Sequence, residues 1–433
     1  MEKQAITFFK TLLTTSFLGV IFFIGLQNKA FSANIILNDT IGFNTYKGIV
    51  VEGNSKKTLG FASLIVNETN ISTVSNSKGE FILKVPKKLR RNSITVSFLG
   101  FTSKVLNLSE LKKGNNIIHL ETYVEELSEV NITMKDAPTL IKEMLKRKEQ
   151  NYALDNLIMT AFYREAIKKR KTYVSLSEAI IILNKEPYNN TRNDILQLHK
   201  SRKSTDYNKL DTIAIKHRGG AHSTVNLDIM KNPELLLTEE IFKNYNFTFD
   251  TSTKINNSII YVVNFKPKEN AENVLFFGKL FIDAQSLALV SAKFEVDLSD
   301  SSKASNFFIL KKPPRVNVTP VEAKYQVDYR KQGNKWYHTY SRIELGFKVN
   351  WNKKLFNSIY YSTMELAITD WYKVNERSEI RPRERLKSSV ILSDEASGFS
   401  DPVFWGEYNL IEPEKPIETA IKKIQKQLKN ITN

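Results

Sequence analysis

Short runs of alternating apolar and polar residues, separated by turn signals, fill residues 46–122. In one of them Phe81, Leu83 and Val85 alternate with the other residues of the run 80–85, two of which are charged, and Gly79 ends the preceding turn, where we expect a positive φ. The expected strands are residues 46–51, 61–66, 80–85, 94–98 and 117–120. Short strands at this regular spacing predict a small β-sandwich rather than a parallel α/β sheet.

A second and longer series of strands begins near residue 157. The expected strands are residues 159–165, 173–183, 259–265, 278–283, 288–296, 321–329, 336–345 and 358–369. We expect loops and a helical stretch near 233–245 within residues 185–250. The series predicts a curved antiparallel sheet over residues 151–412 and a mainly β chain with few helices.

Residues 123–150 are expected to connect the two regions with one strand and one helix. Asp136 can cap the helix N-terminus, and Pro138 suits its first turn. Leu140, Ile141 and Met144 then follow at helical spacing, which predicts an apolar stripe that packs on the next domain.

Three segments of the first region resemble a known domain family. They are YKGIVVEGNSKKTLGFASLIV (46–66), TVSNSKGEFILKVP (73–86) and ITVSFLGFTSKVLNL (94–108). Together they are similar to the carboxypeptidase-regulatory-like domain of Bacteroidetes envelope proteins. This resemblance implies a seven-stranded, transthyretin-like β-sandwich that acts as an accessory module. Residues 124–132 resemble the strand that closes such domains.

The second region resembles the periplasmic part of a Bacteroidetes envelope family of unknown function. The similarity is carried by FYRE at 162–165, by the return strand at 173–179 and by GKLFID at 278–283. It implies a sheet like the half-open barrel of lipoprotein-carrier proteins. Many relatives continue into an outer-membrane barrel, which is not expected within these 433 residues.

The N-terminal 32 residues have the pattern of a secretory signal peptide. Lys3 and Lys10 precede the uncharged run 11–26, and Ala30 and Ser32 occupy the small-residue positions of a cleavage site. We therefore expect a signal peptide at 1–32, a linker at 33–45, and a periplasmic protein or one on the periplasmic face of the outer membrane. The alternative is an uncleaved N-terminal anchor. The chain has no cysteine, so neither disulfides nor an N-terminal lipidated cysteine are expected.

The formal net charge of +17 is compatible with an anionic partner, although the basic runs 87–91, 168–171 and 381–385 are interpreted as solvated loops or edges. In an exported protein such partners are phospholipid headgroups, other envelope anions or acidic glycans, and nucleic acid is not expected. Residues 413–433 read as a C-terminal amphipathic helix with Ile417, Ile421 and Ile424 on its apolar face. This helix is expected either to dock on the body of the protein or to lie on an anionic membrane surface.

No residue pattern in the sequence defines a catalytic, cofactor or metal site. The histidines are His119, His199, His217, His222 and His338. None is followed three residues later by glutamate, as the metal site of a zinc carboxypeptidase requires, so zinc peptidase activity is not expected. His217 and His222 lack an evident third ligand and are interpreted as part of a polar loop.

Three weaker candidates have structural interpretations. Arg164 and Glu165 are adjacent, so on a strand they face opposite sides, and the one that faces the interior needs a partner there. Asp283 is interpreted as a turn former rather than a base. Residues 398–401 are the nearest approach to a nucleophile elbow but lack its second glycine.

These patterns predict a non-enzymatic cell-envelope binding or accessory protein without a cofactor, whose partner is a glycan, a lipid or a protein. The alternatives are an envelope hydrolase with dispersed carboxylates and an accessory subunit of an outer-membrane receptor. A pocket with converging buried groups of perturbed pKa would favour the hydrolase, whereas an open groove would favour binding.

Overall fold

The structure is a computed structural model that describes residues 42–123, 135–205, 220–238, 242–255, 258–269, 276–300, 316–351, 357–377, 379–390, 392, 397, 398, 404–414, 417 and 419. All elements named below belong to one compact unit, Phe43–Asn433. The expected signal peptide, the strand at 124–132 and most of the C-terminal helix lie outside the described residues.

The first seven strands form a β-sandwich of two small sheets. Their bounds are β1 Phe43–Glu52, β2 Ser63–Val66, β3 Ser72–Val74, β4 Glu80–Pro86, β5 Ser93–Ser97, β6 Lys104–Asn107 and β7 Asn116–Leu120. The strand orders are β4-β1-β7 and β3-β2-β5-β6. Apolar side chains such as Val50, Leu64, Leu83 and Val96 fill the space between the sheets with no exposed surface. Gly79 has φ +78°, as the turn pattern predicted.

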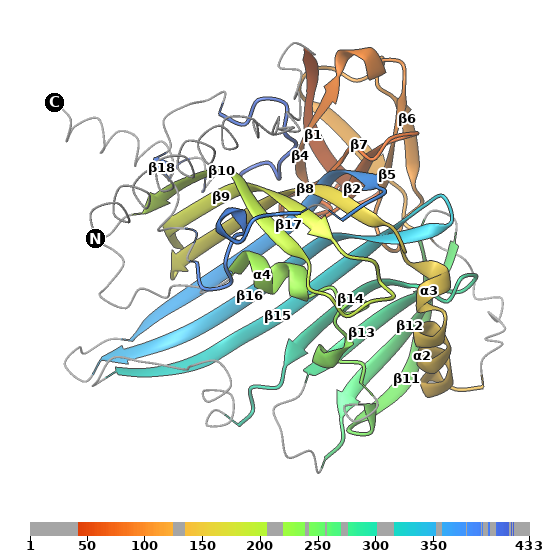
Figure 1. Cartoon of the computed structure of the whole chain (residues 1–433), viewed down its shortest axis with the longest axis vertical. Coiled ribbons are helices and arrows are strands. Elements are labelled where there is room, and N and C mark those ends of the chain that lie inside the picture. The colour runs from red at the N-terminus through yellow and green to blue at the C-terminus, as the bar shows by residue number, and fades with distance from the viewer. Residues whose placement is uncertain are drawn as a thin grey trace, which may run out of the picture. The chain divides into compact units, whose positions relative to one another are not determined.

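The remaining strands form one large sheet that curves without closing into a barrel (Figure 1). Its strand order is β11-β12-β13-β14-β15-β16-β17-β8-β9-β10-β18. The bounds are β8 Asn156–Lys169, β9 Thr172–Lys185, β10 Ile195–Thr205, β11 Tyr245–Ile255, β12 Ser258–Pro267, β13 Phe276–Asp283, β14 Leu289–Val296, β15 Val316–Gln332, β16 Lys335–Trp351, β17 Ser358–Val374 and β18 Ser397–Gly398. All pairings are antiparallel except that of β10 with β18. The predicted fold class is confirmed.

Two strands differ from the prediction for residues 185–250. β10 occupies Ile195–Thr205, where loops were expected, and β11 begins at Tyr245, where the helical stretch was expected to end. The described part of the expected helical stretch holds a 3₁₀ turn at Pro233–Leu235 and an α-helical hydrogen bond from the Phe242 amide to the Thr238 carbonyl, and residues 239–241 lie outside the described residues. The charged residues of β10 had hidden its strand character; one of them, Arg202, forms an ion pair with the buried Glu178 of β9.

Three α-helices accompany the sheet in the described residues: α2 Ala137–Lys146, α3 Lys148–Asn151 and α4 Gly220–Asn226. Asp136 caps α2 as predicted, accepting a hydrogen bond from the Thr139 amide at 2.7 Å. The stripe of Leu140, Ile141 and Met144 is fully buried in the main core of the large sheet. This core lies on one face of the sheet, and the opposite face contacts the sandwich and residues 404–411. None of the helices that the structure describes is long and apolar enough to cross a membrane.

The segment 404–414 runs between the sandwich and the large sheet and bonds to both; we call it the strap. Its Leu410 carbonyl accepts a hydrogen bond from Thr73 of the sandwich, and its Ile411 carbonyl accepts one from Arg164 of the sheet. Trp405 packs edge-on against Phe162 at a ring separation of 5.8 Å. Beyond the strap, Ile417 is buried against Ala166 and Leu176, so this residue docks on the body of the protein.

Candidate functional site

A single row of polar side chains crosses nine neighbouring strands of the large sheet, on the face opposite the main core. Each member lies directly opposite the next in the strand register. From β12 to β10 the row is Asn264, Lys279, Lys293, Gln326, Arg342, Glu365, Arg164, Glu178 and Arg202. Directly opposite side chains interact across strands, so the row behaves as one electrostatic unit. We call it the polar row.

The half of the polar row from β16 to β10 alternates in charge and is covered. Arg164 and Glu178 are 2.8 Å apart with side chains only 3% and 0% exposed. Arg202 reaches the other oxygen of Glu178 at 2.7 Å. Burial raises the pKa of Glu178, but Arg164 and Arg202 outweigh it and hold that pKa below its ordinary value. Arg342 bonds to Glu365, which completes the alternation.

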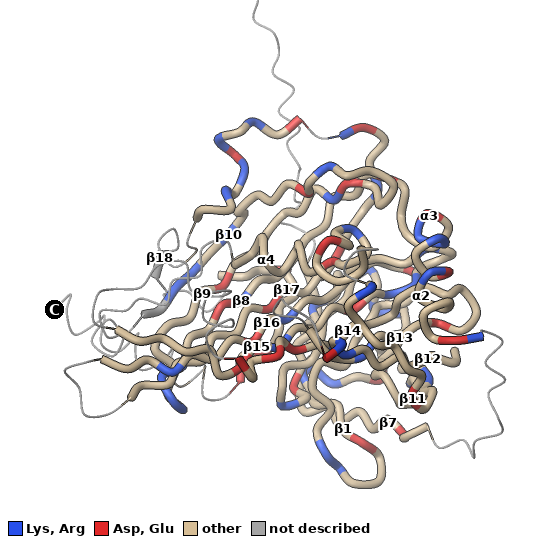
Figure 2. Tube along the Cα trace, turned by 90° about the horizontal axis from the view of Figure 1, so that it is seen from below, with Lys and Arg blue, Asp and Glu red and all other residues tan. Residues whose placement is uncertain are grey.

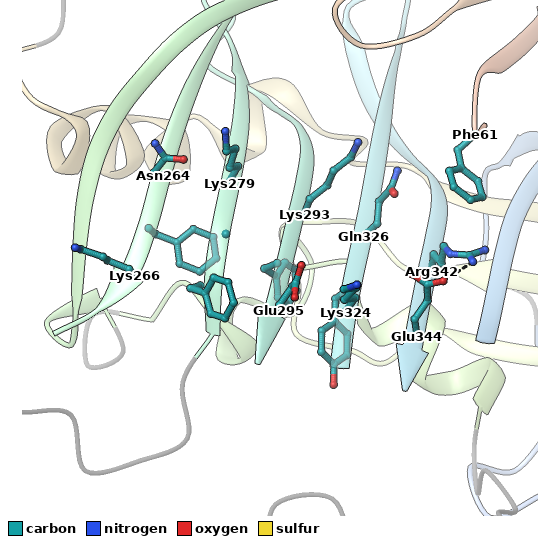
Figure 3. A pocket seen from close by; sticks show the side chains of 15 residues that line it. Phe61, Asn264, Lys266, Lys279, Lys293, Glu295, Lys324, Gln326, Arg342 and Glu344 are labelled. Carbon is teal, nitrogen blue, oxygen red and sulfur yellow. Dashed lines mark hydrogen bonds and ion pairs between the residues drawn. The ribbon is translucent and has the colours of Figure 1, made fainter. Parts of the chain in front are cut away.

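The other half of the row, from β12 to β16, lies in an open groove of about 540 Å³ (Figure 3). In this view Asn264, Lys279, Lys293 and Gln326 follow one another across neighbouring strands, and Arg342 lies beyond Gln326 beside Glu344. A second row lies two residues further along the strands and contains Lys266, Phe277, Glu295, Lys324 and Glu344. The groove is therefore lined by five basic side chains against two carboxylates, with aromatic surface between them.

The cations of the groove differ in how far they are neutralised. Lys279 pairs with Asp250 at 2.7 Å, and this hydrogen bond holds the pKa of Asp250 at about 2. Lys324 pairs with Glu322 at 3.1 Å, and Arg342 bonds to Glu344 at 2.6 Å as well as to Glu365. No carboxylate in the described part of the chain lies within ion-pair distance of Lys266 or Lys293. Lys266 and Lys293 are therefore the two cations of the groove that have no carboxylate partner in the described residues.

Phe61 of the sandwich forms one end of the groove. Its ring lies 4.7 Å from the Arg342 guanidinium and stacks on Tyr340 at 5.9 Å. The backbone of Phe61 has φ +68°, a left-handed conformation that is an outlier for a bulky residue. Strain of this kind persists only where the surrounding structure enforces it, and it is concentrated at functional sites. The sandwich therefore contributes a strained aromatic residue to the groove.

The residues singled out in the sequence lie elsewhere. Arg164 faces the polar row and has the buried partner that was predicted, Glu178. Glu165 faces the main core, where burial raises its pKa to about 7 and Tyr163 donates a hydrogen bond to it at 3.1 Å. Asp283 accepts hydrogen bonds from both the amide and the hydroxyl of Ser286, so it forms a turn as predicted.

The histidine pair and the elbow-like segment are only partly described. The interpretation of a polar loop is wrong for His222, which lies on α4 with its Nε2 atom 2.7 Å from the Leu386 carbonyl oxygen. His217 and residues 399–401 lie outside the described residues. Within the part of the chain that the structure describes, no three histidine, aspartate or glutamate side chains are grouped so that they could hold a metal ion.

A buried polar cluster in the main core was missed in the sequence. Asp228 is fully buried and accepts hydrogen bonds from Lys185 and Tyr188 at 2.7 Å and from Tyr329 at 2.8 Å. Burial alone would raise the pKa of Asp228, but Lys185 and these hydrogen bonds lower it to about 2. Burial lowers the pKa of His338, which is also fully buried, to about 4. Every group of the cluster is enclosed, so it stabilises the core rather than meeting a ligand.

The lysines of the groove were also missed, although the sequence held a signal for them. Lys279 alternates with the aromatic residues Phe277 and Phe281, and Lys293 lies in the next strand along the chain. Cations at alternate positions of neighbouring hairpin strands indicate a basic sheet face. Predicting that Lys279 and Lys293 stand opposite each other requires the pairing register of their two strands, which the alternation of residue types does not determine.

Residues 46–132 match the model of the CarboxypepD_reg-like domain. This match confirms the resemblance on which the accessory role of the sandwich was predicted. It covers the sandwich and the segment after it, and no curated protein matches the chain.

Three solved structures show weak similarity to the chain. A DUF1329 family protein from Desulfovibrio piger has 10% identity and a TM-score of 0.26, over 57% of this chain and 96% of that one. A LolA superfamily protein from Nitrosomonas europaea has 8% identity and a TM-score of 0.22, over 59% and 100%. A structure of lipid–protein interactions in lipovitellin has 10% identity and a TM-score of 0.26, over 59% and 29%. With scores this low, the fold assignment rests on the strand order and register of the chain itself.

Proposed function

We propose that this protein is a non-enzymatic binding protein of the cell envelope and that the groove holds its ligand. The observation that carries the proposal is a groove of about 540 Å³ built jointly by Phe61 of the sandwich and five strands of the large sheet. An open cleft with aromatic surface and a few convergent polar groups is the usual form of a binding site. The CarboxypepD_reg-like sandwich supports an accessory role, in which it shapes the site of the larger domain.

The location of the protein in the envelope is part of the same proposal. It is supported by the charged start, the apolar run and the small residues at Ala30 and Ser32. Envelope fractionation followed by N-terminal sequencing tests it. The proposal expects a mature chain that begins after Ser32, whereas a cytoplasmic chain that begins at Met1 would contradict it.

The distribution of titratable groups supports binding over hydrolysis. A general acid or base must reach its substrate and have a pKa near the working pH. Glu165 has such a pKa, about 7, but it is only 4% exposed. Its neighbour Arg164 is on the sheet face that carries the groove, so Glu165 points to the opposite face. The charged groups that line the groove are mainly ammonium and guanidinium groups. These are suited to hold a ligand by charge and hydrogen bonds.

A groove-filling variant tests the proposal. Gln326→Trp places an indole in the middle of the groove and keeps every charge, and Asn350→Trp places the same side chain at an exposed position near the far end of β16. The wild-type protein and both variants are incubated with fractionated envelope extract, and retained molecules are identified by mass spectrometry. We expect wild-type and Asn350→Trp to retain a ligand that Gln326→Trp does not, and to release it chemically unchanged.

Three results would contradict this function. A retained molecule that is released as a cleaved product would favour the hydrolase. Equal retention by all three proteins would place the binding site elsewhere. Retention of an outer-membrane barrel protein that Gln326→Trp does not affect would favour the accessory subunit of a receptor instead.

A further inference from the structure

Lys279 and Lys293 are directly opposite each other on the neighbouring strands β13 and β14. Both side chains are exposed and belong to the groove. Directly opposite side chains on antiparallel strands have Cβ atoms about 5 Å apart, and like charges in this position destabilise the sheet. From Arg342 to Arg202 the polar row alternates cations with carboxylates, whereas Lys279 and Lys293 are two adjacent cations with neutral Asn264 and Gln326 on either side.

The local carboxylates compensate the pair only in part. Burial raises the pKa of Asp328 on β15 and the nearby Lys293 ammonium counteracts this, so Asp328 partly balances Lys293. Asp250 bonds to Lys279, but the two side chains are 33% and 49% exposed, and an ion pair this open to water contributes little. Lys293 has its ammonium 6.0 Å from the Phe281 ring and no ion-pair partner in the described residues. The fold thus maintains an unfavourable charge arrangement at the floor of an open groove, where an anion from solution could relieve it.

We propose that the Lys279–Lys293 pair binds the phosphate group of a phosphate-bearing ligand; this inference rests on the proposed function of the groove. Lysine ammonium groups bind phosphate as point charges, and the fork of arginine binds both phosphate and carboxylate. The arginine of the groove, Arg342, already bonds to Glu344 and Glu365.

The rest of the groove suits the remainder of such a ligand. Lys266 lies one row further along on β12 and can receive a second anionic oxygen. Phe277 is 40% exposed, which is unusual for a phenylalanine, and it offers apolar surface beside the lysines. Phe61 closes the end of the groove next to Arg342 (Figure 3). A phosphate ester and a phospholipid headgroup share this chemistry, and the experiment below separates them.

The test uses the mature full-length protein and two variants of equal charge. Lys279→Gln with Lys293→Gln removes the pair, and Lys87→Gln with Lys88→Gln removes two exposed lysines from the sandwich. Binding of pyrophosphate and of glycerol 3-phosphate is measured by isothermal titration calorimetry. Co-sedimentation is measured with phosphatidylglycerol vesicles and with phosphatidylcholine vesicles as the zwitterionic control.

We expect the wild-type protein and the Lys87/Lys88 variant to bind a phosphate probe, and the Lys279/Lys293 variant to bind it roughly tenfold more weakly or worse. Binding of the soluble probes indicates a soluble ester, and binding of phosphatidylglycerol vesicles alone indicates a lipid headgroup. We also expect the Lys279/Lys293 variant to melt at a higher temperature than wild-type without phosphate, because the repulsion is gone, and to lose the stabilisation that phosphate gives.

Two outcomes would overturn the inference. If both double variants bind the phosphate probes and vesicles as wild-type does, the pair is not the site. If wild-type binds no phosphate probe in any form, the ligand is of another class. In that second case the proposed function still holds if the wild-type protein retains an uncharged envelope ligand and Gln326→Trp does not. If the wild-type protein binds no phosphate probe and retains no envelope ligand in the groove, the proposed function is wrong as well.

Discussion

The side chain of Asn409 forms two hydrogen bonds with the backbone of Lys84, accepting from its amide at 2.7 Å and donating to its carbonyl at 2.9 Å. Lys84 lies on β4, an edge strand of the smaller sandwich sheet. One amide side chain therefore takes the place of a neighbouring strand on that edge. Because Asn409 belongs to the strap, these two bonds hold the strap against the sandwich, while Arg164 holds it against the sheet.

Replacing Asn409 should loosen this connection. Asn409→Ala leaves the Lys84 backbone groups without their partners in a site where Asn409 is only 6% exposed. We expect a loss of about 1–3 kcal/mol in the free energy of unfolding, measured by urea denaturation. Asn246→Ala, at an exposed position of β11, is a control with the same change outside the strap. A loss of equal size in both variants would show that the strap bonds contribute nothing particular.

Asp228→Asn should be far more damaging than loss of a surface carboxylate. The substitution removes the charge that faces the buried ammonium of Lys185 and weakens the hydrogen bonds from Tyr188 and Tyr329. Removing one partner of a buried ion pair costs about 3–5 kcal/mol, and the remaining contact of Lys185 with Asp194 places the expected loss near the lower end. Asp250→Asn breaks an exposed pair with Lys279 and should change stability little. Similar urea midpoints for the two variants would contradict this.

Phe61 allows backbone strain to be separated from ring contacts. Phe61→Ala and Phe61→Gly both remove the contacts with Tyr340 and Arg342, but glycine adopts φ +68° without the steric cost that alanine has. We expect Phe61→Gly to be more stable than Phe61→Ala by roughly 1 kcal/mol in thermal or urea unfolding. Equal stability would mean that the backbone relaxes out of the left-handed region once the ring is removed.

Local patterns in the sequence predicted the local structure well. Asp136 and Pro138 marked the start of α2, and the turn before Gly79 determined its positive φ. The adjacency of Arg164 and Glu165 predicted that they face opposite sides and that one needs a buried partner, which Glu178 provides. In each case the relevant residues are close in sequence, so propensity and alternation are sufficient.

The candidate site could not be predicted in the same way, because it depends on register. Arg164 meets Glu365 across β8 and β17, although about half the chain separates them. Register also explains why β10 was missed. Residues around Lys200 and Arg202 were expected to form a loop, and only the pairing of Arg202 with Glu178 shows that they belong to a strand. Alternation shows which side chains share a face, but only the pairing of strands shows which stand opposite one another.

Glu165→Gln should remove a pH dependence of stability. Burial raises the pKa of Glu165 from 4.5 in the unfolded chain to about 7 in the folded protein. Between these values the folded state holds a proton that the unfolded state has lost, so the free energy of unfolding falls as the pH rises through this window and is level above it. A shift of this size corresponds to about 3 kcal/mol. Figure 2 shows acidic positions along several strands, so a control carboxylate is needed.

The glutamine variant keeps an acceptor for the Tyr163 hydroxyl but has no proton to lose. We therefore expect Glu165→Gln to differ little from wild-type at about pH 4, where wild-type Glu165 is protonated in both states, and to be more stable by up to about 3 kcal/mol at about pH 8. Glu110→Gln, at an exposed position of the sandwich, should follow wild-type at both values. Urea unfolding at the two pH values measures the difference. If the stability gap between Glu165→Gln and wild-type is the same at both, folding does not raise the pKa of Glu165, and the burial of a neutral carboxyl beside Tyr163 near pH 7 is wrong.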